Sequence, residues 1–403
     1  MLQPCIGCTS SLHRCPQLQR MFGIRHHLYD PVRRFHIVLW FRSERSRNNC
    51  KRGAYIDSQN ANSQNIRMEH NAPHPGATFE GYYCKFDLPS GAHLAVIVCE
   101  VRRAKQRPNM VSFTYVPAKD VGKTFQEEVW PRELHFVEYD KQSHAFGLEA
   151  PGVGFKRWQG DFTTEYSFEH EYFTFHAKTT THRPWSETVD TPEWLLVRLP
   201  LPLHWHVHSL GSECEFELKL KDYDLPLEDR KGKAIVHQEK NWSHSFPSAH
   251  MWLQARDGDR AFCAAGGQIL GLEAFLVGYR SKDLSMDFRP PFALRAAGLS
   301  PFLSYHSDFN KRSFEMSVQS FRQKLTVTAT APEGSFFPLS APFQEGHRPN
   351  FLNQTYQATF VIRIYESGWL GPWKLVKEDV FKNASLEFGG GYYPFAGTDD
   401  EFH

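Results

Sequence analysis

The chain of 403 residues is long enough for one large or two ordinary domains, and its net charge is +1. Residues 1–67 carry a net charge of +8, which leaves −7 for residues 68–403. A mildly acidic body lacks the basic face that nucleic-acid binding needs, so nucleic acid is not expected as a partner. No apolar run approaches the roughly 18 residues of a membrane-spanning helix. Aromatic residues make up 14% of the chain, which indicates that some rings line a pocket for an apolar ligand.

The first 67 residues form a basic leader with ten Arg and one Lys against three acidic residues. This composition is typical of a mitochondrial transit peptide, and a disordered tail has a similar composition. A third interpretation is that the natural protein starts at Met68. Cys5 and Cys8, with His13 and Cys15, could hold zinc, but no second ligand pair follows, so no metal is predicted. Cys50 also lies in the leader, and the other four of the eight cysteines are scattered through the body without a disulfide framework. We therefore expect an intracellular protein, cytoplasmic, or mitochondrial if the leader is genuine.

From Phe79 onward the pattern predicts β-structure almost throughout. Residues 79–88 and 93–101 are extended runs on either side of a Pro-Ser-Gly turn, which predicts a hairpin. Residues 162–181 alternate over a long stretch. Residues 204–220 are expected to form another alternating pair of strands, with Gly211 at its centre.

The later segments predict further short strands and no helix of ten or more residues. They are the runs 261–265, 275–280, 313–320, 324–330 and 356–366, separated by turn signals such as Asp257-Gly258 and Glu333-Gly334. Many short strands at such spacing indicate sandwiches or barrels, and their number exceeds one small barrel. The sequence therefore predicts an all-β protein with two β units in tandem, residues 68–240 and 241–403. We expect the join between the units within residues 222–255.

The segment around Glu239 gathers groups suited to acid chemistry. Alternation in a strand over residues 234–239 puts His237 and Glu239 on one face, and the chain is expected to leave the strand after Glu239. Trp242, Phe246 and Trp252 then supply rings. A carboxyl group surrounded by rings loses solvation, which favours its neutral, proton-donating form. Ring faces stabilise a carbocation by ~1–2 kcal/mol each. The alternative is a buried Glu that ties down a loop, with the rings as core.

A second candidate cluster is formed by His204, His206 and His208, which alternate and so share one strand face. Two histidines at this spacing could hold zinc with a third ligand. The chain contains 21 histidines, so some clustering is expected, and a polar strand face or pocket lining is the favoured interpretation.

The central segment resembles the signature of the tocopherol cyclase-like family. The family's Glu-Lys-Asn-Trp, Phe-Pro and Trp-x-Gln elements match residues 239–242, 246–247 and 252–254, and its Phe-Glu-Gly-aromatic-Tyr strand matches residues 79–83. Further matches are residues 340–346, 364–366 and 384–393, so the resemblance spans about 79–395 in order. The chain departs from the plant-type pattern at Ser243-His244-Ser245, where glycines are usual, and at residues 248–251.

The resemblance implies lipocalin-like β-barrel or sandwich units and a cofactor-independent closure of a chromanol ring. A general acid protonates the double bond of a prenylated hydroquinone, and the phenol oxygen captures the cation. On this basis Glu239 is predicted as the acid, with His237 as its partner or as the base for the phenol. The predicted substrate-binding residues are Asn241, Trp242, Phe246, Trp252, Gln254, His206 and His208. The predicted partner is a hydrophobic small molecule, a prenylated aromatic compound. Peripheral contact of the protein with a membrane would allow its uptake.

Two alternatives of other kinds remain open at this point. A lipocalin-type protein could bind prenyl lipids without converting them. A related olefin hydratase or cycloaddition catalyst could use the same scaffold.

Overall fold

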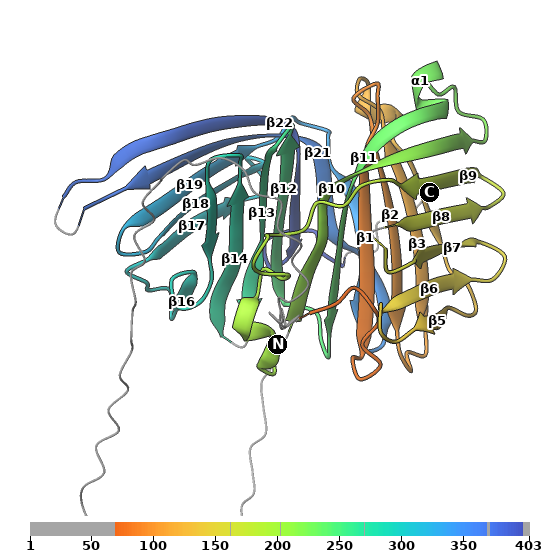
Figure 1. Ribbon diagram of the computed structural model, residues 1–403, viewed down its shortest axis with the longest axis horizontal. Coiled ribbons are helices and arrows are strands. Elements are labelled where there is room, and N and C mark those ends of the chain that lie inside the picture. Colours follow the sequence, from red (N-terminus) through yellow and green to blue (C-terminus); the bar gives the residue numbers. More distant parts are fainter. Residues whose placement is uncertain (1–68, 162, 202, 270, 369–370, 398–403) are drawn as a thin grey trace, which may run out of the picture. The chain divides into compact units, whose positions relative to one another are not determined.

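The computed structural model describes residues 69–161, 163–201, 203–269, 271–368 and 371–397. The leader, with Cys5, Cys8 and Cys15, lies outside these residues. Two eleven-stranded antiparallel sheets dominate the structure, so the predicted all-β class with two lipocalin-like units is confirmed (Figure 1). Helical structure in the described residues is limited to α1 (Leu227–Arg230) and two 3-10 turns, Val121–Lys123 and Trp194–Arg198. No helix among them is long and apolar enough to cross a membrane.

The first sheet has the strand order β4-β3-β2-β1-β11-β10-β9-β8-β7-β6-β5, so β11 returns to pair with β1 at the centre of the sheet. Its strands are β1 (Phe79–Asp87), β2 (His93–Val101), β3 (Asn109–Val116), β4 (Phe125–Val129), β5 (His135–Asp140), β6 (Ala145–Ala150), β7 (Gly154–Trp158), β8 (Thr164–Glu169), β9 (Phe173–Thr179), β10 (Leu203–Leu220) and β11 (Lys231–Ser243).

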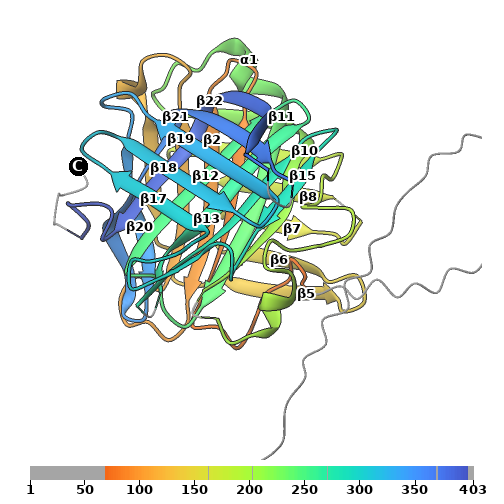
Figure 2. The ribbon, with the colours of Figure 1, turned by 90° about the vertical axis from the view of Figure 1, so that its left-hand side faces the viewer.

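The second sheet has the order β15-β14-β13-β12-β22-β21-β19-β18-β17, with β16 paired to β14 and β20 paired to β21. The chain passes from the first sheet to the second between Ser243 and Ala249. In Figure 2 the second sheet lies toward the viewer, in front of the first. The strands are β12 (Ala249–Asp257), β13 (Arg260–Ile269), β14 (Leu272–Arg280), β15 (Ser285–Phe288), β16 (Leu294–Ala296), β17 (Leu303–Asp308), β18 (Ser313–Gln319), β19 (Gln323–Thr330), β20 (Phe337–Phe343), β21 (Gly346–Glu366) and β22 (Lys374–Gly390).

Hairpins that local sequence signals predict are present in the structure. The hairpin over residues 79–101 is confirmed as β1 and β2, with Gly91 in the left-handed region (φ +85°) that its turn requires. The alternating stretch 162–181 contains a second hairpin, β8 and β9.

Two expected strand ends are wrong. Residues 204–220 lie in one strand, β10, instead of a pair centred on Gly211, because β-bulges between Val207 and Ser212 let the strand continue past this irregularity. Strand β11 continues through Lys240 and Asn241 to Ser243, since both neighbours, β1 and β10, stay paired with it along this stretch. The alternation of side chains therefore also continues past Glu239.

Each sheet covers its own apolar core, and a third region of buried side chains lies between the sheets. The first core includes Phe86, Phe113 and Phe175, and the second includes Phe314 and Phe360. Fully burying such a side chain contributes about 1.5–3 kcal/mol. The region between the sheets is built from two clusters of buried residues: Phe79, Phe246, Phe337 and Tyr356 with their neighbours, and Trp185, Trp205 and Trp252 with theirs. Many rings of the described residues thus serve as core, and a further group gathers where the two sheets meet.

Candidate active site

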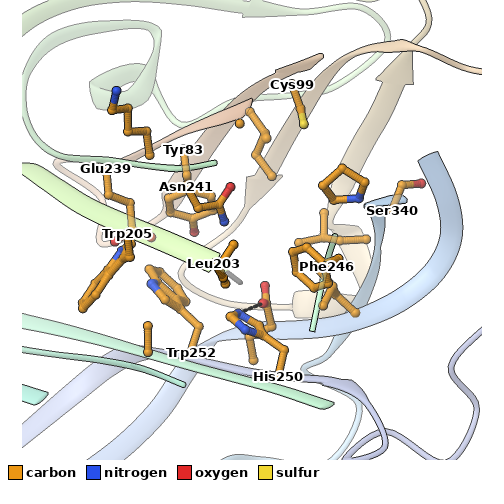
Figure 3. Close-up of a pocket in the computed structure, with 18 of the residues that line it drawn as sticks. Tyr83, Cys99, Leu203, Trp205, Glu239, Asn241, Phe246, His250, Trp252 and Ser340 are labelled. Carbon is orange, nitrogen blue, oxygen red and sulfur yellow. Dashed lines mark ion pairs between the residues drawn. The ribbon is translucent and has the colours of Figure 1, made fainter. Parts of the chain in front are cut away.

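A cavity of about 90 Å³ lies between the two sheets (Figure 3). Its lining includes Glu239 and Trp205 from the first sheet and Trp252, His250 and Glu387 from the second. Figure 3 shows Glu239 grouped with Trp205 and Trp252, while Phe246 and Ser340 lie at the other end. The lining is mostly apolar, with a few polar groups that converge on it, which is the usual composition of a small-molecule site.

Strand register explains why Glu239 faces this cavity. On β11, Glu239 lies opposite Tyr83 of β1 and Val207 of β10, and His237 lies opposite Lys85. Because residues two apart share a face, His237, Glu239 and Asn241 all point to the side of the second sheet. Nε2 of His237 lies 2.8 Å from Oε2 of Glu239, and both side chains are buried. The other ring nitrogen, Nδ1 of His237, has no hydrogen-bond partner among the described residues.

A second histidine–carboxylate pair reaches the same cavity from the second sheet. Nε2 of His250 on β12 lies 3.3 Å from Oε1 of Glu387 on β22, and both are buried. Gln354 donates a hydrogen bond of 3.0 Å to Oε2 of Glu387, which holds this carboxylate from the other side. Sequence reasoning missed both residues of this pair. The only available signal was the placement of His250 two residues before Trp252 in a run with strand character.

Aromatic side chains form much of the wall around Glu239. The rings of Trp252 and Tyr83 meet edge to face with centroids 4.9 Å apart. The hydroxyl groups of Tyr83 and Tyr356 are 3.0 Å apart. Burial raises the pKa of both tyrosines, so both hydroxyl groups stay protonated and can donate. The indole N–H groups of Trp205 and Trp252 are buried without a partner in the described structure.

Gln254 belongs to a polar network between the sheets and is not among the residues that line the cavity. Its Oε1 accepts hydrogen bonds from Nζ of Lys85 at 3.2 Å and from Ser385 at 3.3 Å. Lys85 also lies 3.2 Å from Asp87, which Arg256 contacts at 2.8 Å. Burial raises the pKa of Asp87, but the charges of Lys85 and its neighbours outweigh this and hold the pKa well below its usual value. The network therefore keeps its charges paired at the junction of the sheets.

Asn241 and Phe246 line the cavity, whereas Trp242, His206 and His208 lie on the opposite face of the first sheet. Trp242 stacks on His74 with a centroid distance of 4.2 Å. His208 packs against Trp158, and burial lowers the pKa of His206 to about 3, so this imidazole is neutral. The reason is the continued alternation of β11 and β10, which sends every second side chain away from Glu239.

This opposite face carries a buried ionic cluster around Lys240. Nζ of Lys240 lies 3.1 Å from Oε1 of Glu80 and donates a hydrogen bond of 2.7 Å to the carbonyl oxygen of Ala72. Burial raises the pKa of Glu80, but Lys240 and a hydrogen bond to His74 outweigh it and lower the pKa to about 2. Glu80 and Lys240 are therefore an ion pair that supports β1 and β11 from behind the cavity.

Comparison with known proteins gives similarity at the level of the fold. No protein-family model and no curated protein sequence matches the chain. CghA and kievitone hydratase are among the solved structures that resemble it. CghA in complex with Sch210972 has a TM-score of 0.52 and 9% identity, and the match covers 77% of this chain and 88% of that one. Kievitone hydratase from Nectria haematococca has a TM-score of 0.50 and 8% identity, with 79% and 91% covered. At such low identity the likeness establishes a shared fold.

Proposed function

We propose that this protein is an acid catalyst for an apolar olefin, and specifically a tocopherol cyclase-like enzyme that closes a chromanol ring on a prenylated hydroquinone. The observation that carries the proposal is the buried pair of His237 and Glu239, which faces a mostly apolar cavity beside Trp205 and Trp252. A proton held between a carboxylate and an imidazole in an apolar setting can be delivered to a carbon–carbon double bond. The aromatic walls suit the positive charge that such a protonation creates.

The reaction balances without any further reactant. Glu239 donates a proton to the less substituted carbon of the prenyl double bond, and the other carbon becomes a tertiary cation. A lone pair of the phenol oxygen then forms the new C–O bond. The phenol proton leaves to His237 or directly to Glu239, which restores the acid. The product is an isomer of the substrate.

The size of the cavity limits how the substrate can bind. An engineered protein cavity of about 150 Å³ holds a benzene molecule, whereas the space here is about 90 Å³. A substituted aromatic ring therefore requires lining side chains to move. Phe246 lies on the segment that links the two sheets, so its displacement would widen the cavity without breaking a strand.

Hydration of an olefin is the second candidate, and the pair of His250 and Glu387 favours it. One histidine–carboxylate pair could donate the proton while the other takes a proton from the attacking water. The fold likeness to a protein named as a hydratase agrees with this chemistry at the level of the scaffold alone. A prenyl-lipid carrier without catalysis would use the same cavity and leave its ligand unchanged.

The test is incubation of the purified full chain with a prenylated methylhydroquinone under reducing conditions, followed by chromatography with mass detection. An isomeric product that is lost in Glu239→Gln supports the cyclase. A product heavier by one water, with the same loss, identifies a hydratase. Substrate that co-elutes unchanged with the protein identifies a carrier. Glu315→Gln, at an exposed position on β18, is the matched control and retains full turnover.

A further inference from the structure

We propose a zinc-type divalent metal site formed by Glu69, His70 and His74, in the segment that precedes β1. One ligand atom from each of the three side chains lies within 4.8 Å of the others. The site lies on the face of the first sheet that carries Lys240 and Trp242, away from the cavity between the sheets. Two imidazole nitrogens and one carboxylate oxygen are a donor set that zinc uses when it keeps a further position open.

The distance between Glu69 and His74 fits a shared metal ion. Nε2 of His74 lies 3.3 Å from Oε1 of Glu69. Ligand atoms at 2.0–2.1 Å from a tetrahedral zinc ion are about 3.3 Å apart, so these two atoms already have the spacing of one tetrahedral edge. The third ligand, His70, has its Nδ1 at 3.9 Å from the same oxygen, so a small rotation of its partly exposed ring completes the set.

The contacts around His74 orient it as metal ligands are usually oriented. Nδ1 of His74 lies 3.1 Å from Oε1 of Glu80 and 3.0 Å from Nζ of Lys240, and its Nε2 faces Glu69. Nδ1 of His70 contacts the carbonyl oxygen of Ala72 at 3.1 Å, a contact that a small rotation of the ring would exchange for the metal ion. A carboxylate or carbonyl that fixes the ring nitrogen opposite the metal is the common second layer of such sites.

A third histidine, His206, has unused hydrogen-bonding capacity near the cluster. His206 is only 4% exposed, and its Nδ1 has no partner among the described residues. Burial lowers the pKa of this imidazole, and the charges of Glu69, Lys240, His70 and His74 also act on it. A buried imidazole nitrogen without a partner is rare and indicates a ligand or an ion nearby.

Access and charge also fit a metal ion. The side chains of His70 and His74 are 34% and 24% exposed, whereas Glu69 is 5% exposed, so an ion would enter from solvent onto a buried carboxylate. Lys240 is the competing cation. Its Nζ is 3.9 Å from Glu69 but 3.1 Å from Glu80, so Glu80 neutralises the ammonium group and Glu69 remains for the metal.

The experiment is titration of the chelator-treated full chain with Co²⁺ and Zn²⁺. We expect one Co²⁺ per chain, with visible absorption bands of a tetrahedral nitrogen–oxygen site and no near-ultraviolet thiolate band. Zn²⁺ should displace Co²⁺ and raise the melting temperature. His70→Ala and Glu69→Gln should each weaken binding at least tenfold, and both lie at positions where loss of the fold is not expected. His306→Ala, an exposed histidine on β17, is the matched control and leaves binding unchanged.

Three results would overturn the site. One is the absence of binding at micromolar metal, since Lys240 would then be the cation that the cluster holds. Another is binding that survives His70→Ala and disappears in Cys5→Ser/Cys8→Ser, since the ion would then belong to the leader. The third is equal weakening by His70→Ala and His306→Ala. None of these readings depends on turnover at the cavity.

Discussion

Replacing Glu239 with Gln separates the role of this residue as an acid from its role in packing. Gln has nearly the same shape and can still accept a hydrogen bond from His237, whose Nε2 lies 2.8 Å from the carboxylate. A hydrogen bond to a charged group contributes about 1.5–3 kcal/mol and one between neutral groups about 0.5–1.5, so unfolding should become easier by ~1–2 kcal/mol. Turnover should fall by about 10²–10⁴-fold, because an amide cannot donate a proton to an olefin.

The assay pairs product formation with thermal unfolding of the same samples. Chromatography measures the isomer or the hydrated product, and the melting curve reports the fold. The reasoning is refuted if Glu239→Gln remains folded and keeps more than about one tenth of the activity of the unchanged protein, since a general acid contributes at least ~10²-fold. A variant that loses both activity and fold calls for Glu239→Asp, which keeps the acid but shortens its reach. That variant should fold and show partial activity.

Three further changes test other parts of the structure. Glu387→Gln should lower any hydrated product at least tenfold and leave ring closure within a few-fold, which the product ratio measures. Trp252→Phe keeps the ring but removes a partnerless indole N–H, so KM should rise by about tenfold (~1.4 kcal/mol) with kcat within a few-fold; an unchanged KM would remove this group from substrate binding. Burial lowers the pKa of His347 from 6.5 to about 4, so the unfolded chain binds more protons between these values. Stability should therefore be full above pH 6.5 and fall by about 3 kcal/mol toward pH 4, and His347→Gln should remove this part of the slope in urea unfolding.

The strands that could be predicted are those with local signals. The hairpin of β1 and β2 follows from two extended runs and a Pro-Ser-Gly turn, all within 23 residues of sequence. The pairing of His237 with Glu239 follows from period-two alternation within one strand. Such inferences need no knowledge of what lies across the sheet.

The parts that could not be predicted depend on distant pairing. The sequence predicts Trp242 beside Glu239, but its side chain faces the other way because pairing with β1 and β10 keeps β11 extended to Ser243. His250 and Glu387 meet only because β12 pairs with β22 across 137 residues of sequence. No local pattern in a single sequence records that contact.

Buried indole N–H groups without hydrogen-bond partners lie at the junction of the sheets, and they bear on both stability and substrate binding. The indole N–H groups of Trp185, Trp205 and Trp252 are all buried there without a partner among the described residues. Each buried donor without a partner costs about 1–3 kcal/mol, so a junction selected for stability alone would not keep three of them. Two of the three, Trp205 and Trp252, line the cavity beside Glu239. A phenol or carbonyl oxygen of a bound substrate would accept hydrogen bonds from these two groups. Substrate binding would then offset the free-energy cost of the two unpartnered donors.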